Sequence, residues 1–115
     1  MATTKLTIRE YVTAQGTSPF RTWLSRLDVT VRARIQARVL RFETGNLGDH
    51  RAVGRGVWEA RCDFGPGYRI YFAKPGTTIL LLLLGGDKAS QRADIPNAQK
   101  HWTDYLEAMD RGTSK

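Results

Sequence analysis

The chain has 115 residues, enough for one hydrophobic core and too few for two ordinary domains, so we expect residues 1–115 to form a single domain. Its 18 Lys and Arg residues against 11 Asp and Glu residues give a formal net charge of +7, and 13 of these cations are arginines. Because the arginine fork matches phosphate and carboxylate edges, an acidic partner is expected. One cysteine and two histidines exclude an internal disulfide and a usual structural zinc site, so no metal or cofactor is expected.

The first residues lack the apolar stretch of a secretory signal. The longest apolar run, Ile79–Leu84, is far shorter than the roughly 20 residues that a membrane-spanning helix needs. We therefore expect a cytoplasmic protein without membrane contact, which also fits the lone cysteine.

The first part of the chain predicts a strand followed by a helical hairpin. Lys5–Val12 alternates loosely between polar and apolar residues, as strands do. Ser18 and Pro19 are typical of a helix start, and Asp28 can cap a second helix that ends near Gly45. The apolar stripes of the two helices are Phe20, Trp23, Leu24 and Leu27, then Val31, Ile35, Val39 and Phe42.

The second part predicts a loop, three strands and a final helix. Asn46–Gly56 is rich in glycine and basic residues and has no period, so it is predicted to be a loop. Val57–Phe64, Tyr68–Lys74 and Thr77–Leu84 are separated by short Gly- and Pro-containing turns, which predicts an antiparallel meander. The apolar stripe of the final helix is Ile95, Ala98, Trp102, Tyr105, Leu106 and Met109.

These elements predict an α+β domain. It would have a mainly antiparallel four-stranded sheet, an N-terminal helical hairpin and a C-terminal helix. We expect the helices to cover one face of the sheet and to leave the other face partly open.

Alternation along the meander predicts a polar patch on the open face. Glu59 and Arg61 share one side of their strand, and a tight hairpin would bring Arg69 and Tyr71 next to them. The alternative is cross-strand ion pairing between Glu59 or Asp63 and the arginines on a solvated surface.

Two blocks of sequence resemble a known family. Residues 58–72 read WEARCDFGPGYRIYF, and residues 81–91 read LLLLGGDKASQ, with DIPNA following at 94–98. Together they resemble the HigB-like branch of the RelE/ParE toxins, known as addiction-module killer proteins. The resemblance extends from Leu6 to about Leu106 and implies a RelE-like fold.

The resemblance also implies a function. Such proteins are bacterial type II toxins, usually neutralised by a helix-turn-helix antitoxin encoded beside them. Most RelE-like and HigB-like members cut mRNA in the ribosomal A site, so a metal-independent, ribosome-dependent endonuclease is the first expectation. ParE-like members instead poison DNA gyrase, and a third alternative is an antitoxin-binding co-repressor with weak or lost toxicity. Operator DNA would be bound only through the antitoxin.

Four residues are the catalytic candidates. Arg61 and Arg69 match the family's basic sheet positions that bind the scissile phosphate, so each is expected to stabilise charge there. Lys88 follows the last strand and is the candidate base or acid; the alternative is a surface residue paired to Asp87. Tyr71 is expected to stack on a splayed base or to donate a proton; otherwise it is only a strand aromatic.

Two further groups are candidates for RNA binding. The lysine pair that RelE carries before the meander has no counterpart here, and the predicted loop offers His50, Arg51 and Arg55 instead. On the second helix, three arginines share one face by their spacing. That face is either simply solvated or contacts ribosomal RNA or acidic antitoxin segments; its members are Arg34, Arg38 and Arg41.

Overall fold

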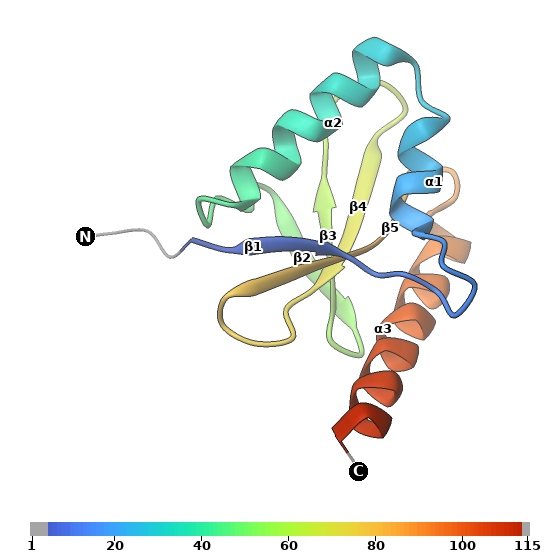
Figure 1. The fold of residues 1–115 in the computed structure, drawn as a ribbon. Helices are drawn as coiled ribbons and strands as arrows, with labels where there is room; N and C mark the ends of the chain where they lie inside the picture. The colour runs from blue at the N-terminus through green and yellow to red at the C-terminus, as the bar shows by residue number, and fades with distance from the viewer. Residues whose placement is uncertain (1–4, 114–115) are drawn as a thin grey trace.

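The computed structural model describes residues 5–113 and confirms an α+β architecture (Figure 1). Three helices pack against one five-stranded sheet. In chain order the elements are β1 (Thr7–Glu10), α1 (Pro19–Ser25), α2 (Val29–Phe42), β2 (His50–Gly54), β3 (Val57–Arg61), β4 (Tyr68–Ala73), β5 (Ile79–Asp87) and α3 (Gln91–Thr113).

The sheet is mixed, and its strand order is β1-β5-β4-β3-β2. β1 lies parallel to β5, and the remaining neighbours are antiparallel. The prediction of four strands was wrong, because His50–Gly54 is a strand and not a loop. Only Val53 of this edge strand is even half-buried, so the sequence carries no apolar alternation there.

The predicted helical hairpin is confirmed. The Ser18 hydroxyl accepts a hydrogen bond from the backbone N–H of Arg21, and Pro19 opens α1. The Asp28 carboxylate accepts from the backbone N–H of Thr30 at the start of α2. These bonds satisfy donors that would otherwise lack partners at the helix ends.

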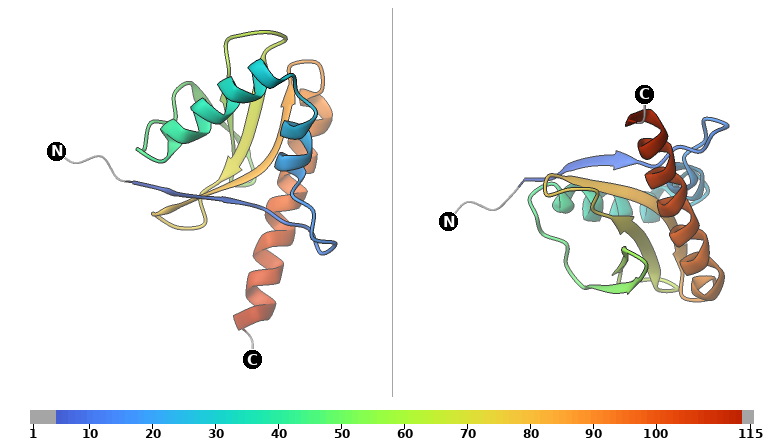
Figure 2. Two further views of the ribbon diagram at one scale, coloured as in Figure 1. Left: turned by 45° about the horizontal axis from the view of Figure 1, so that its top comes forward. Right: turned by 90° about the horizontal axis from the view of Figure 1, so that it is seen from below.

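The helices cover both faces of the sheet, so the prediction of one open face was wrong. Ile70 and Phe72 of β4 pack with residues of α1 and α2, whereas Tyr71 and Ala73 pack with Ala98 of α3. Because neighbouring strand residues point to opposite faces, β4 and β5 need apolar cover on both sides. Figure 2 shows the sheet and its helices from two further directions.

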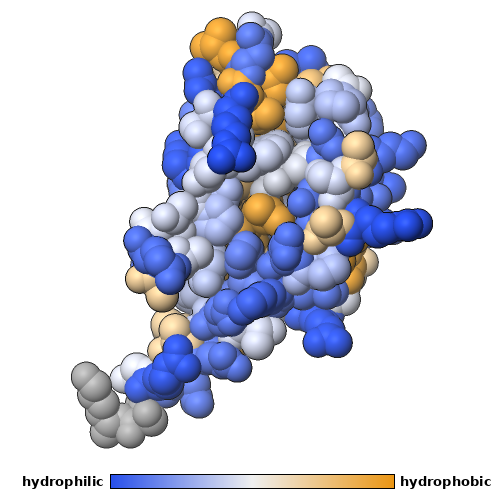
Figure 3. All heavy atoms as spheres, turned by 90° about the vertical axis from the view of Figure 1, so that its right-hand side faces the viewer, coloured by the Kyte–Doolittle hydropathy of each residue, from blue (hydrophilic) through white to orange (hydrophobic). Residues whose placement is uncertain are grey.

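The last part of α3 extends past the sheet (Figures 1 and 2). Ile95, Trp102 and Tyr105 pack against the core as predicted, but Leu106 and Met109 are exposed because no strand lies beneath them. No helix within residues 5–113 has the length and apolar character needed to span a bilayer. The surface on this side of the molecule is mostly hydrophilic, with small hydrophobic patches (Figure 3).

Two glycines at the end of β5 let helices approach from both sides. A Cβ atom on Gly85 would overlap the ring of Trp23 in α1. A Cβ atom on Gly86 would overlap the carboxylate of Asp94 in α3. The close approach of α1 and α3 at this end of the sheet therefore depends on the absence of a Cβ atom at Gly85 and Gly86.

Replacing Gly85 with alanine is expected to lower the free energy of unfolding by about 1–3 kcal/mol, because the rigid Trp23 ring must move. Urea denaturation measures this. Gly76→Ala is the matched control, since a Cβ atom there has no atom within 4 Å and stability should change little. Equal stability of the two variants would contradict this account of β5.

Candidate functional site

A buried carboxylate lies in the middle of β3. The side chain of Glu59 is fully buried, and its partners come from three other elements. Arg51 of β2 donates from Nε to Glu59 Oε1 at 3.0 Å, and Gln91 of α3 donates to Oε2 at 2.7 Å. The Nε atom of Arg69, on β4, lies 3.9 Å from Oε1. We call these four residues the Glu59 network.

The network keeps Glu59 ionised. Burial alone raises the pKa of the carboxyl group, but hydrogen bonds from Gln91 and Arg51 outweigh it and hold the pKa below its ordinary value. A buried charge is tolerated only when it is paired and hydrogen-bonded. The arginines are therefore part of the fold as well as candidates for function.

Tyr71 lies directly opposite Glu59 in the β3–β4 register. Its side chain is fully buried, because α3 covers this part of the sheet. Burial, and then the nearby charge of Glu59, raise the pKa of the Tyr71 hydroxyl, which stays protonated. The expected stacking of Tyr71 on a nucleotide base does not fit this position, since the ring has no exposed face.

Arg61 and Arg69 are also opposite each other on β3 and β4, as the hairpin predicted. Like charges facing each other across strands repel, and here each arginine has its own carboxylate. Arg61 donates to Asp49 Oδ1 at 2.9 Å, while Arg69 is the ion-pair partner of Glu59. The Arg61 side chain is 40% exposed and that of Arg69 only 12%.

Lys88 follows β5 and lies close to Arg69. A Cβ atom on Gly67 would be 3.5 Å from both the Arg69 Nη1 atom and the Lys88 Cβ atom, so the two side chains flank the same turn. The Asp87 carboxylate accepts from the backbone N–H of Ser90 at 3.0 Å. No ion pair joins Asp87 to Lys88 within residues 5–113, and Lys88 is an exposed residue.

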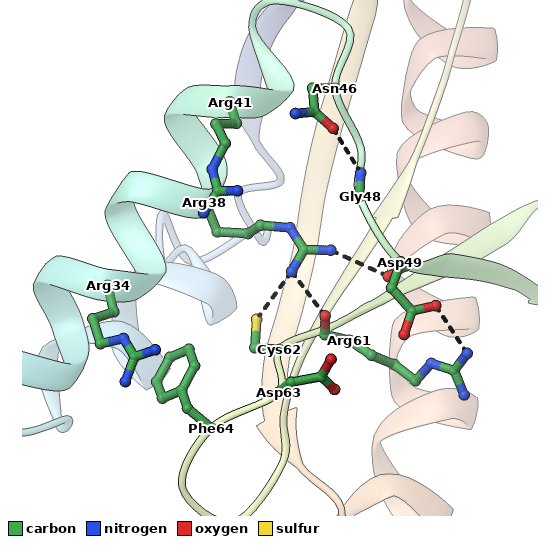
Figure 4. Close-up of a pocket in the computed structure, with 10 residues that line it drawn as sticks. All are labelled: Arg34, Arg38, Arg41, Asn46, Gly48, Asp49, Arg61, Cys62, Asp63 and Phe64. Atoms are coloured by element: carbon green, nitrogen blue, oxygen red, sulfur yellow. Dashed lines mark hydrogen bonds and ion pairs between the residues drawn. The ribbon is translucent and has the colours of Figure 1, made fainter.

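The three arginines of α2 line a cleft between this helix and the end of β3 (Figure 4). The cleft has a volume of about 320 Å³, and Arg61 borders it. We call it the arginine cleft. Its lining residues are Arg34, Arg38, Arg41, Asn46, Gly48, Asp49, Arg61, Cys62, Asp63 and Phe64.

Arg38 is a structural clamp in this cleft. Its guanidinium group donates to the carbonyl oxygens of Arg61 at 2.8 Å, Leu47 at 3.0 Å and Asp49 at 3.1 Å. Gly48 has a φ of 64°, and a Cβ atom there would lie 2.7 Å from Arg38 Nη2. A side chain at position 48 would therefore strain the backbone and displace the guanidinium group of Arg38.

Arg34 and Arg41 are held less tightly than Arg38. The guanidinium carbon of Arg34 lies 3.8 Å from the centre of the Phe64 ring, an arrangement typical of a cation–π contact. Arg41 is exposed and makes no ion pair with the described residues. Both guanidinium groups are available to an anion in the cleft.

The other three RNA-binding candidates are not brought together. His50 packs on the α1 and α2 side, with its ring 5.6 Å from that of Trp58, while Arg51 points to the opposite face and pairs with Glu59. Arg55 lies in the β2–β3 turn with a φ of 57° and borders a separate pocket beside α3. The sequence groups them only because it predicts Asn46–Gly56 to be a loop, whereas His50–Gly54 is a strand whose neighbouring residues point to opposite faces.

Two residues of the site gave no signal in the sequence. Asp49 and Gln91 are ordinary polar residues until the chain folds, when they reach Arg61 and Glu59. Neither contact follows a strand or helix period. Among residues 5–113, no three His, Cys, Asp or Glu side chains are grouped so that they could hold a metal ion.

Comparison with known proteins identifies one relative. Over 84 residues the chain is 42% identical to an "uncharacterized protein" of Haemophilus influenzae. The match covers 72% of this chain and 85% of the Haemophilus protein. The two proteins belong to one family. No family model matches the chain, and no solved structure matches it significantly.

Arg38→Ala is expected to lower the free energy of unfolding by about 2–3 kcal/mol, because three carbonyl groups lose a charged donor. Arg41→Ala should change it by less than about 0.5 kcal/mol, because Arg41 is exposed and has no ion-pair partner among residues 5–113. Chemical denaturation of both variants measures the difference. A clamp role for Arg38 is ruled out if the two variants are equally stable.

Proposed function

We propose that the protein is the toxin of a type II toxin–antitoxin module. In this proposal it acts in the bacterial cytoplasm as a metal-independent endonuclease that cuts mRNA on the ribosome. The sequence blocks that resemble HigB-like toxins support the proposal, and so does the position of the arginines within these blocks.

One observation carries the proposal: Arg61 and Arg69 face each other across β3 and β4, and Lys88 lies beside Arg69. In RNA cleavage the 2′-oxygen loses its proton to a water molecule and forms a bond to phosphorus, while the bond from phosphorus to the 5′-oxygen breaks and that oxygen gains a proton. Negative charge grows on the phosphate oxygens during this step. Two guanidinium forks at fixed positions are suited to stabilise it.

Lys88 is the proposed proton donor to the leaving 5′-oxygen. Lys88 is exposed, flanks the same turn as Arg69, and is not ion-paired to Asp87, whose carboxylate accepts from the backbone N–H of Ser90. Proton transfer by a positioned side chain contributes typically about 10²- to 10⁴-fold to a rate. Tyr71 is too deeply buried to touch a substrate and has no step in this proposal.

Glu59 is a positioning residue in this proposal, since its buried carboxylate cannot contact RNA. It pairs with Arg69 and so limits the orientations of that guanidinium group. An arginine held in place before the substrate arrives needs little reorganisation when charge develops.

The proposed partners are the ribosome, mRNA and a helix-turn-helix antitoxin, through which alone the toxin would reach operator DNA. An acidic or amphipathic antitoxin segment that covers Arg61 and Arg69 would block the phosphate site directly. The exposed carboxylate of Asp49 already occupies Arg61 in the free protein, so an acidic side chain can take the same place.

The proposal is tested by mapping the 5′ ends of mRNA in a reconstituted translation reaction. Wild-type protein should cut at defined codon positions only when ribosomes are present. Arg69→Ala should cut about 10²- to 10³-fold more slowly, because one charge-stabilising contact is lost. Lys88→Ala should also slow cleavage, and its exposed position leaves the fold unchanged.

Arg26→Ala is the matched control, since Arg26 is exposed at the end of α1 and outside the site. It removes the same charge and should cut like wild type. Full cleavage by a folded Arg69→Ala variant would overturn the assignment. Growth arrest with intact mRNA and inhibited supercoiling would indicate a gyrase poison, and no growth effect without antitoxin would indicate a co-repressor.

A further inference from the structure

The arginine cleft lies next to the proposed reaction site but is distinct from it. It opens between α2 and the end of β3, and among its arginines only Arg61 belongs to both places (Figure 4). Arg61 thus connects the cleft with Arg69 and Lys88. A polyanion bound at Arg61 could therefore contact both the arginine cleft and the proposed reaction site.

The cleft carries positive charge that its own acids do not balance. Of its two aspartates, Asp49 is paired with Arg61, and Asp63 is exposed. The clamp bonds of Arg38 go to carbonyl oxygens, which are neutral and leave the guanidinium charge uncompensated. Together with Arg34 and Arg41, this leaves a group of like charges that an anion would stabilise.

Two of the arginines already make contacts before any ligand binds. Arg38 is held by its carbonyl partners, and Arg34 lies against the ring of Phe64. Ordering a long side chain costs about 0.5–1.5 kcal/mol on binding, and this cost is reduced where the side chain is already immobile. The cleft is therefore largely preformed for an anion, and the Arg41 side chain can reorient toward the ligand.

We propose that the arginine cleft binds a backbone phosphate of single-stranded RNA next to the phosphate held by Arg61 and Arg69. This inference rests on the proposed function and adds a second contact for the same substrate. RNA is favoured over an acidic peptide because Arg61 joins the two sites, and a nucleotide chain carries phosphates at regular intervals. The planar forks of the cleft suit phosphate oxygens.

The test uses a short fluorescent oligouridylate with 2′-O-methyl groups, which cannot be cleaved, and measures anisotropy without ribosomes over a range of salt concentrations. Wild-type protein should bind, with affinity falling as salt rises. Arg41→Ala should lower the slope of log affinity against log salt by about 0.7, the value for one phosphate contact on a single strand, which is about fivefold in affinity at 0.1 M salt.

Arg26→Ala again removes one charge outside the cleft and should leave the slope unchanged. Equal slopes for the two variants, or no binding by wild type at low salt, would overturn the inference. Displacement of the RNA by an oligoglutamate of equal charge at equal concentration would assign the cleft to an acidic peptide instead. This assay measures binding and not cleavage. If the cleft binds RNA but the protein does not cut mRNA in the translation reaction, this inference holds and the proposed function fails.

Discussion

The carboxylate of Glu59 is ionised and buried in the middle of the sheet, and the positions of Arg51 and Arg69 depend on it. A charge in that position must be paired, and its partners come from β2, β4 and α3. The ion pairs with Glu59 hold Arg51 and Arg69 in place. Together with the hydrogen bond from Gln91, they connect β2 and the start of α3 to β3. The same contacts that stabilise the fold thus determine where Arg51 and Arg69 point.

Arg38 organises its surroundings on the opposite side of the sheet from Glu59. It joins the turn that contains Gly48 to the end of β3, and so holds Asp49 beside Arg61. The cation of Arg38 and the anion of Glu59 each organise backbone or side chains around an internal charge. Near these two residues, Arg61 pairs with Asp49 and Arg69 shares Glu59 with Arg51, while Lys88 has no ion pair with the described residues, so the positive charges are only partly balanced. This excess of positive charge is the observation on which the proposed binding of RNA depends.

The sequence predicted what depends on local chemistry. The caps Ser18 and Asp28, the stripe of α2 and the Arg61–Arg69 pairing across a tight hairpin all follow from short-range rules, and all are present. It failed where distant segments decide the outcome. β2 was missed because an exposed edge strand needs no apolar alternation, and the burial of Tyr71 and Glu59 follows from α3 crossing a face that was expected to be open. Asp49 and Gln91 acquire roles only through contacts made by folding.

The most direct test of this account is the free energy of unfolding of wild type and Glu59→Gln measured across acidic and neutral pH. The pKa of Glu59 is lower in the folded protein than its ordinary value of 4.5, so ionisation stabilises the folded state. That stability is present above about pH 4.5 and is lost as the pH falls through the lowered pKa of the folded protein. The account predicts that wild type loses stability relative to Glu59→Gln over this acidic range. A constant difference between the two proteins, or a relative gain by wild type in acid, would contradict it.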